Sequence, residues 1–208
     1  MDRADRIHVR RHFKRWFRVA AIVQSILDQK GGAPLDVGCS SGFFLLLMGR
    51  GIGLDYGENV DICIRRGLKV LQVNLEAEPF PFEDGSFTVV TCLEVIEHLR
   101  HPEKMLKEIR RVLGDEGVLL LSTPNTKSPV WIIRDLLISS PLLSRLYAGR
   151  VFIPDVRRYS LEDAKRLLTK TGFSIQSVIY LRIILPADDV LLVAQKESQW
   201  YHSVQSRR

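Results

Sequence analysis

The stretch LDVGCSSGFFLLLM, residues 35–48, decides the fold. It begins with a short apolar run that holds one acidic residue, Asp36, and it ends with six apolar residues. Between them lie Gly38 and Gly42, which lack a Cβ and therefore let the backbone turn tightly and a ligand approach closely. We interpret the stretch as a strand, a tight turn and the opening of a helix whose first amides are hydrogen-bond donors.

Strands and helices are expected to alternate on both sides of this stretch. Apolar runs predict strands, and helical spacing of apolar residues predicts helices. The expected strands are 34–39, 51–55, 69–74, 87–93 and 118–122, the last introduced by a turn at 115–117; the expected helices are 5–29, 43–48, 59–66 and 102–113. This order predicts a parallel sheet with helices on both faces.

The C-terminal part is expected to add one helix and a hairpin. Ser160 and Asp163 have the spacing of a capping box, so a helix should start there and run to Thr171, with Gly172 as its cap. Two β-rich runs, 174–185 and 189–196, are joined by too few residues for a parallel crossover. The predicted fold class is therefore α/β, a doubly wound, seven-stranded, mostly parallel sheet with an antiparallel last strand.

Length and composition fit one globular domain over residues 1–208. The chain is 46% hydrophobic and 26% charged, and its three cysteines show no C-x-x-C spacing. We expect reduced thiols, no metal site and a cytoplasmic location. The basic start lacks the apolar core of a secretory signal, and the longest apolar stretch, 129–147, is interrupted too often to span a membrane.

Three segments within this domain are set apart. Residues 1–32 are expected to form an amphipathic helix that ends at two glycines, 127–157 a helical cap, and 197–208 a flexible tail. Core packing, an apolar acceptor pocket and contact with a membrane surface all suit the cap. The charge of +6 comes largely from the two ends, which suit nucleic acid, acidic lipid, an anionic substrate or a solvated helix face.

The spacing of the residues around the turn bears on the kind of cofactor. Asp55 follows Asp36 by 19 residues, near the distance at which a carboxylate accepts hydrogen bonds from ribose hydroxyls. A dinucleotide fingerprint would need glycine at Ser40 and Phe43, and no phosphate-binding G-x-x-x-x-G-K-[ST] loop is present. A nucleoside-bearing cofactor other than a nicotinamide dinucleotide or a nucleoside triphosphate fits best.

Over residues 35–196 the chain resembles the class I S-adenosylmethionine-dependent methyltransferases, in particular the small type 11-like domains. The motifs that carry the resemblance are LDVGCSSG (35–42), GLD (53–55), NL followed by PFPFEDGSF (74–75 and 79–87), CLEVIEHL (92–99) and the final hairpin. Ser40 replaces a frequent glycine, and Asn74 replaces a more usual aspartate. The resemblance implies that S-adenosylmethionine is held by Asp36, Gly38, Cys39, Gly42, Asp55, Tyr56, Asn74, Leu75 and Leu93.

Methyl transfer from a sulfonium is a direct displacement, so alignment of the acceptor and exclusion of water come first and a general base is optional. His98 is the candidate base, because an imidazole titrates near neutral pH, and Glu94 is the candidate contact to cofactor or acceptor. A purely structural role for His98, bracing the segment after the fourth strand, stays open. Glu97 and His101 are expected to face solvent or to pair locally.

The sequence thus predicts methyl transfer to a small-molecule acceptor, apolar or anionic. An RNA or protein methyltransferase is the alternative within enzymes, although motifs for sequence-specific nucleic-acid readout are missing. A non-catalytic cofactor-binding module is the alternative outside them. The oligomeric state and the acceptor atom do not follow from the sequence.

Overall fold

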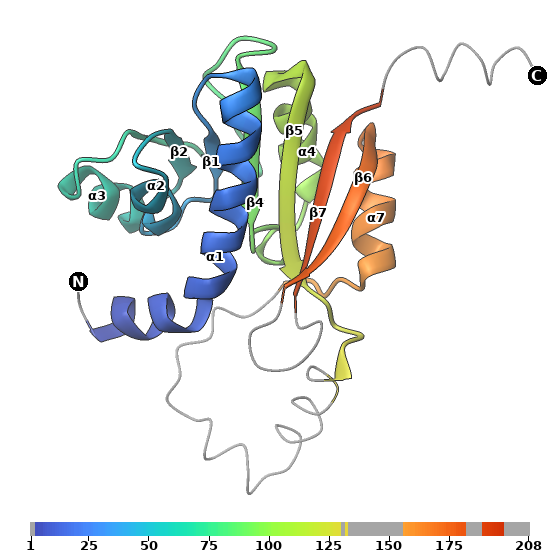
Figure 1. Cartoon of the computed structure of the whole chain (residues 1–208), viewed down its shortest axis with the longest axis horizontal. Coiled ribbons are helices and arrows are strands. Elements are labelled where there is room, and N and C mark those ends of the chain that lie inside the picture. Colours follow the sequence, from blue (N-terminus) through green and yellow to red (C-terminus); the bar gives the residue numbers. More distant parts are fainter. Residues whose placement is uncertain (1–2, 130–131, 133–155, 182–188, 198–208) are drawn as a thin grey trace, which may run out of the picture.

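The computed structural model describes residues 3–129, 132, 156–181 and 189–197, with the side chains of the first helix described from Arg15 onward (Figure 1). Its helices are α1 (Arg3–Lys30), α2 (Phe43–Met48), α3 (Glu58–Arg65), the 3-10 helix η1 (Ile96–His98), α4 (Pro102–Val112) and α7 (Leu161–Lys170). Its strands are β1 (Leu35–Val37), β2 (Ile52–Asp55), β3 (Val70–Gln72), β4 (Phe87–Leu93), β5 (Leu113–Pro124), β6 (Phe173–Leu181) and β7 (Asp189–Lys196).

The described strands form one seven-stranded sheet in the order β3-β2-β1-β4-β5-β7-β6. Strand β1 pairs in parallel with β2 and β4, whereas β7 is antiparallel to both β5 and β6. This confirms the predicted doubly wound sheet and its antiparallel last strand. Strand order reverses between β1 and β4, and ligands of such sheets bind beyond the strand ends at that point. We call the side on which β1, β2, β4 and β5 end the carboxyl edge.

Helices cover both faces of the sheet, as predicted. On one face α4 and α7 bury Met105 and Leu168 in the larger core. On the other face α1 and α2 bury Val19, Val23 and Phe44 against β4, β5 and β7. Burial of each large aliphatic or aromatic side chain contributes roughly 1.5–3 kcal/mol, so these two layers fix the strand ends that carry the site.

Several predicted boundaries are confirmed. Helix α2 and strand β4 begin and end at the predicted residues. Helix α1 ends at Lys30, where Gly31 and Gly32 take positive φ angles. Strands β6 and β7 pair as an antiparallel ladder, while the expected connection between them lies within 182–188, outside the described residues. The same holds for most of the expected cap and nearly all of the expected tail.

The predicted start of the fifth strand was wrong. Strand β5 begins at Leu113 rather than at Val118, and it includes the residues expected to form a turn. Its pairing shifts from Phe87–Leu113 to Val89–Val118, which is an irregularity of the ladder. A Cβ on Gly117 would lie 2.8 Å from a methyl carbon of Leu113, so the glycine allows the chain to double back tightly. The turn residues mark a bulge inside the strand.

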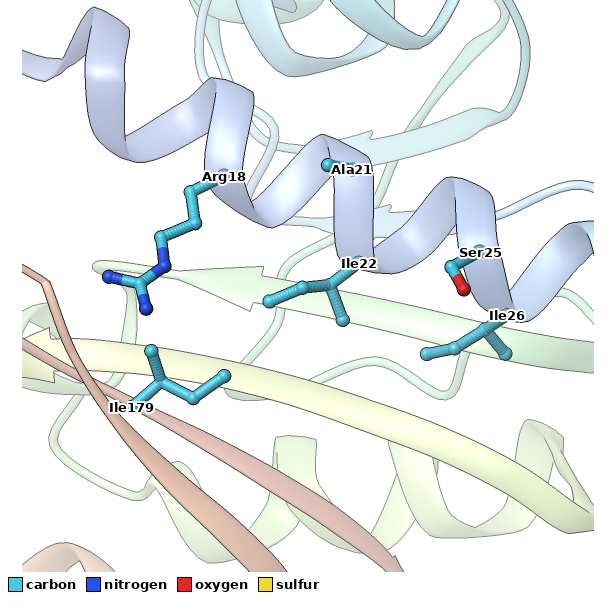
Figure 2. A pocket seen from close by; sticks show the side chains of 6 residues that line it. All are labelled: Arg18, Ala21, Ile22, Ser25, Ile26 and Ile179. Atoms are coloured by element: carbon cyan, nitrogen blue, oxygen red, sulfur yellow. The ribbon is translucent and has the colours of Figure 1, made fainter.

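Part of the sheet face on which helix α1 packs is left open as a groove. A groove of about 480 Å³ lies between α1 and Ile179 of β6 (Figure 2). It is lined by Arg18, Ala21, Ile22, Ser25, Ile26 and Ile179. None of the residues expected to hold the cofactor lines this groove. Across the described ranges, no helix has the length and apolarity needed to cross a bilayer.

The capping box predicted at Ser160 is confirmed and generates a stability prediction. The Ser160 hydroxyl accepts a hydrogen bond from the Asp163 amide at 3.2 Å, and the Asp163 carboxylate accepts one from the Ser160 amide at 3.1 Å. We expect Ser160→Ala to lower the free energy of unfolding by about 1 kcal/mol in urea titrations. Lys165→Ala, which removes an exposed ion pair on the same helix, should cost less than about 0.5 kcal/mol. Equal losses of unfolding free energy in the two variants would show that the capping box contributes no more than an exposed ion pair.

Candidate functional site

The candidate site lies at the carboxyl edge, where three neighbouring strands end. Val37 pairs with Leu54 of β2 on one side and with Cys92 of β4 on the other. The residues that follow these strand ends, Gly38 and the segments beginning at Asp55 and Leu93, therefore lie next to one another. The topology brings together three of the motifs singled out in the sequence.

The glycine turn, residues 38–42, is held tightly at this edge. The amides of Gly38 and Cys39 both donate to the carbonyl of Leu54, at 2.8 and 3.1 Å. Gly38 has φ +73°, and a Cβ there would lie 2.4 Å from a methyl carbon of Val95. Gly42, with φ +77°, is the N-cap of α2. Both predicted glycines thus occupy conformations that other residues rarely adopt.

Asp55 fastens the glycine turn to the end of β2. One carboxylate oxygen accepts a hydrogen bond from the Ser40 amide at 2.6 Å. The other accepts from the Tyr56 amide at 2.8 Å and from the Asn59 side chain at 3.2 Å. The carboxylate is only partly buried. It is thus a fixed, solvent-reachable acceptor beside the turn, as a ribose-binding residue must be.

Ser40 has an unusual backbone conformation. Its φ is +48°, a left-handed value that is costly for a residue with a Cβ. The hydrogen bond from its amide to Asp55 offsets that cost, and Arg66 donates to the next carbonyl, that of Ser41, at 2.6 Å. These bonds stabilise the turn with serine at position 40.

Asp36 lies beneath the turn rather than at its surface. Its side chain is buried in β1 and accepts a hydrogen bond from the Thr91 hydroxyl at 2.7 Å. Burial raises the pKa of Asp36 to about 7; the Thr91 hydrogen bond opposes this shift and the charge of Asp55 adds to it. Cys39 is also buried, and its sulfur packs against Gly53, where a Cβ would lie 2.6 Å away. Burial raises the pKa of this thiol, so it stays protonated.

Three of the remaining residues expected around the cofactor, Tyr56, Asn74 and Leu75, lie close to Asp55. The Val73 amide donates to the Asp55 carbonyl at 2.9 Å, which brings the end of β3 and the following Asn74 and Leu75 close to it. The Asn74 side chain accepts a hydrogen bond from the Glu76 amide at 3.1 Å and so shapes this turn. Tyr56 is 59% exposed. Its position directly after Asp55 leaves its ring available to a ligand.

Glu94 and His98 lie on the other side of the glycine turn, after β4. Glu94 has a φ of +59°, so it is, like Ser40, a residue with a Cβ in the left-handed region that favours glycine. The Ser122 hydroxyl donates to its carboxylate at 2.7 Å, and its amide donates to the Ser122 carbonyl at 3.0 Å. His98 lies in η1, half-buried, and Leu93 is half-buried at the end of β4. The strained backbone at Glu94 is thus held by two bonds to β5.

A buried charge cluster next to Glu94 was not predicted. It consists of Arg15, Glu94, Glu97 and Asp189. The Arg15 side chain, 3% exposed, forms a close ion pair with Asp189 and lies 3.5 Å from Glu94. Burial alone would lower the pKa of Arg15, but these carboxylates raise it above its usual value. The cluster joins α1, the end of β4 and the start of β7.

Two sequence expectations are corrected here. The arginines of the first helix were expected on its outer face, yet Arg15 is buried, next to the buried Trp16 in the sequence. Glu97 was expected to face solvent or to pair locally, yet it is buried and accepts a hydrogen bond from Thr123 at 3.3 Å. The partners of both residues are distant in sequence, so local periodicity had no signal for them. His101 is exposed, as expected.

A second network fixes the loop that precedes β4. Arg111 donates to the carbonyls of Phe80 and Phe82 at 2.9 and 2.7 Å, and Glu108 accepts from the Phe80 amide at 2.8 Å. These bonds anchor residues 79–87, one of the stretches that carry the resemblance, onto α4. In the described ranges, no three His, Cys, Asp or Glu side chains are arranged to hold a metal ion. The three cysteines are buried and free.

Comparison with known proteins shows similarity to methyltransferases. A model of a methyltransferase domain family matches residues 9–178. A probable S-adenosylmethionine-dependent methyltransferase of Mycobacterium tuberculosis is 34% identical over 119 residues, 53% of this chain and 43% of that protein. A ubiquinone biosynthesis O-methyltransferase of Methylococcus capsulatus is 26% identical over 121 residues, 53% of this chain and 51% of that protein. The chain spans about half the length of these two relatives.

Solved structures show the same fold. That of an S-adenosylmethionine-dependent methyltransferase from Thermotoga maritima, a possible histamine N-methyltransferase, has a TM-score of 0.62. It is 20% identical in sequence, and the superposition covers 90% of this chain and 98% of that one. At this identity the likeness concerns the fold alone.

The raised pKa of Asp36 predicts a specific pH dependence of stability. The folded protein keeps a proton on Asp36 up to about pH 7, whereas the unfolded chain releases it near the ordinary value of 3.8. The free energy of unfolding should therefore fall as pH rises through this window, by a few kcal/mol at most. Asp36→Asn should remove this fall while keeping the Thr91 hydrogen bond, as followed by urea unfolding from pH 4 to 8. The same slope in wild type and variant would contradict the assignment; exposed Asp61→Asn is the control.

The buried charge cluster predicts a large penalty for losing Arg15. Arg15→Met removes the guanidinium that pairs with the buried Asp189 and lies near Glu94, and we expect it to lower the free energy of unfolding by about 3–5 kcal/mol. Adding Asp189→Leu should recover part of that loss. Arg18→Met, at an exposed position of the same helix, should cost less than about 1 kcal/mol. Independent, additive effects of the two cluster substitutions in urea titrations would show that the pair is not coupled.

Proposed function

Because the chain belongs to the S-adenosylmethionine-dependent methyltransferases, we propose that it transfers the methyl group of S-adenosylmethionine to a small-molecule acceptor. The observation that carries this proposal is the Asp55 carboxylate fixed 2.6 Å from the amide of Ser40 in the glycine turn. That arrangement puts a ribose acceptor beside a backbone that a ligand can approach closely. The ubiquinone biosynthesis relative supports a small molecule as acceptor.

The residues present fit the cofactor. Gly38 lets the turn pack closely against Val95, and the partly buried Asp55 is reachable from solvent beside this turn. In this proposal Asp55 holds the ribose, Gly38 and Gly42 border the methionine part, and Tyr56, Asn74, Leu75 and Leu93 line the remainder. Asp36 and Cys39, being buried, support the turn from below. When bound, S-adenosylmethionine supplies an electrophilic methyl group on a sulfonium.

The chain's own contribution is to position the acceptor and exclude water. Glu94 is 22% exposed and its carboxylate is oriented by Ser122 and Arg15. It can therefore accept a hydrogen bond from an acceptor hydroxyl or ammonium without moving. His98, on the same segment, is the group proposed to take a proton from acceptors that need a base.

Cofactor binding is tested by calorimetric titration with S-adenosylhomocysteine and, in parallel, with NADH. We expect binding of the first alone. Asp55→Ala should weaken it by about thirtyfold or more, since hydrogen bonds to a charged acceptor are lost. The matched control is Asp61→Ala, an exposed carboxylate on α3, which should bind as wild type does. Preference for NADH, or no binding at all, would overturn the cofactor assignment.

The acceptor is tested separately, with labelled S-adenosylmethionine and a panel of phenols, catechols and amines. Transfer to one of these, reduced by His98→Ala or Glu94→Gln at unchanged S-adenosylhomocysteine affinity, supports the assigned roles. Transfer only to RNA or to protein would replace the small-molecule acceptor by the alternative.

A further inference from the structure

Large apolar side chains are exposed at the carboxyl edge. Ile132 is 57% exposed and Val156 53%, and Phe17 on α1 is 45% exposed. Single exposed apolar residues are ordinary on protein surfaces, but several at one edge indicate a surface that is covered in use.

Hydrogen bonds of these residues and their sequence neighbours place them at the edge. The Arg157 amide donates to the carbonyl of Glu97, just after β4, at 3.0 Å. Ile132 lies in the segment that follows β5, and its amide donates to the Ser128 carbonyl at 3.2 Å. Arg18 donates to the Tyr180 carbonyl near the end of β6. Figure 1 shows that the segment after β5 and the amino-terminal half of α1 both extend beyond the edge of the sheet.

Exposed cations accompany the apolar side chains. Arg18, Lys127, Arg157 and Arg158 are all exposed at this edge. Glu162, the exposed carboxylate that follows them on α7, pairs with Lys165 at 3.1 Å. The part of the edge next to the ends of β5 and β6 is therefore both basic and partly apolar.

We propose that the carboxyl edge docks on an anionic lipid surface. Basic residues gain from anionic headgroups, while Ile132, Val156 and Phe17 gain from the boundary between headgroups and acyl chains. A nucleic acid would satisfy the cations but offers no comparable environment for exposed aliphatic side chains, so lipid fits the combination better. The proposal goes beyond methyl transfer, and its consequence is that the acceptor entrance faces the lipid.

The test is co-sedimentation of the full chain with vesicles of phosphatidylcholine containing about 30% phosphatidylglycerol. We expect binding at about 0.05 M salt that is lost at about 0.5 M, and none to pure phosphatidylcholine, because the attraction is screened. Lys127→Glu with Arg157→Glu should lower the apparent affinity about tenfold or more. Ile132→Ser with Val156→Ser should lower it about threefold or more, since two apolar contacts are lost.

Matched controls lie elsewhere on the surface. Lys107→Glu with Lys170→Glu makes the same change of charge on α4 and α7, and Leu46→Ser with Ile64→Ser removes two other exposed apolar side chains. Both controls should bind vesicles within about twofold of wild type. Absence of binding, equal losses in the controls, or competition by polyuridylate without any effect of the apolar pair would overturn the proposal. S-adenosylhomocysteine affinity, measured on the same proteins, reports the proposed function independently.

Discussion

Strand β1 is only three residues long, yet it is hydrogen-bonded in parallel to β2 on one side and to β4 on the other. Because both ladders keep register, the chain leaving β1 must turn within a few residues, between Asp55 and the segment after β4. Gly38 makes that turn feasible, since any Cβ there would collide with Val95. The geometry of the candidate site follows from this constraint, and the helices on either face serve to hold it.

The parts of the fold that depend on local pattern were predictable from the sequence. Helix α2, strand β4 and the capping box at Ser160 were confirmed because each has its signal within a few neighbouring residues. Asp55 was found by its distance from Asp36, and the structure brings it to the glycine turn. The predicted start of β5 was wrong by several residues, Val118 instead of Leu113, because the same glycines are typical of a bulge and of a turn.

The buried charge cluster could not be predicted, because its members come from distant parts of the chain. The sequence pattern indicates only that Arg15 is one more cation of a basic helix and that Asp189 is the polar start of a strand. Only the packing of α1 across β4, β5 and β7 makes them partners. Burying such a pair is costly in itself and rarely adds net stability, so its value lies in specifying one arrangement of these elements. That arrangement includes the strained backbone of Glu94.

The insertion of β7 between β5 and β6 also bears on the order in which a nascent chain can fold. Until residues 189–196 have emerged from the ribosome, β6 has no neighbour in the sheet and the ladder of β5 is open on one side. Arg15, synthesised 174 positions before Asp189, meanwhile lacks this partner. Such long-range closure is slow, so the growing polypeptide should stay dependent on shielding of its apolar strands until translation of this segment is complete.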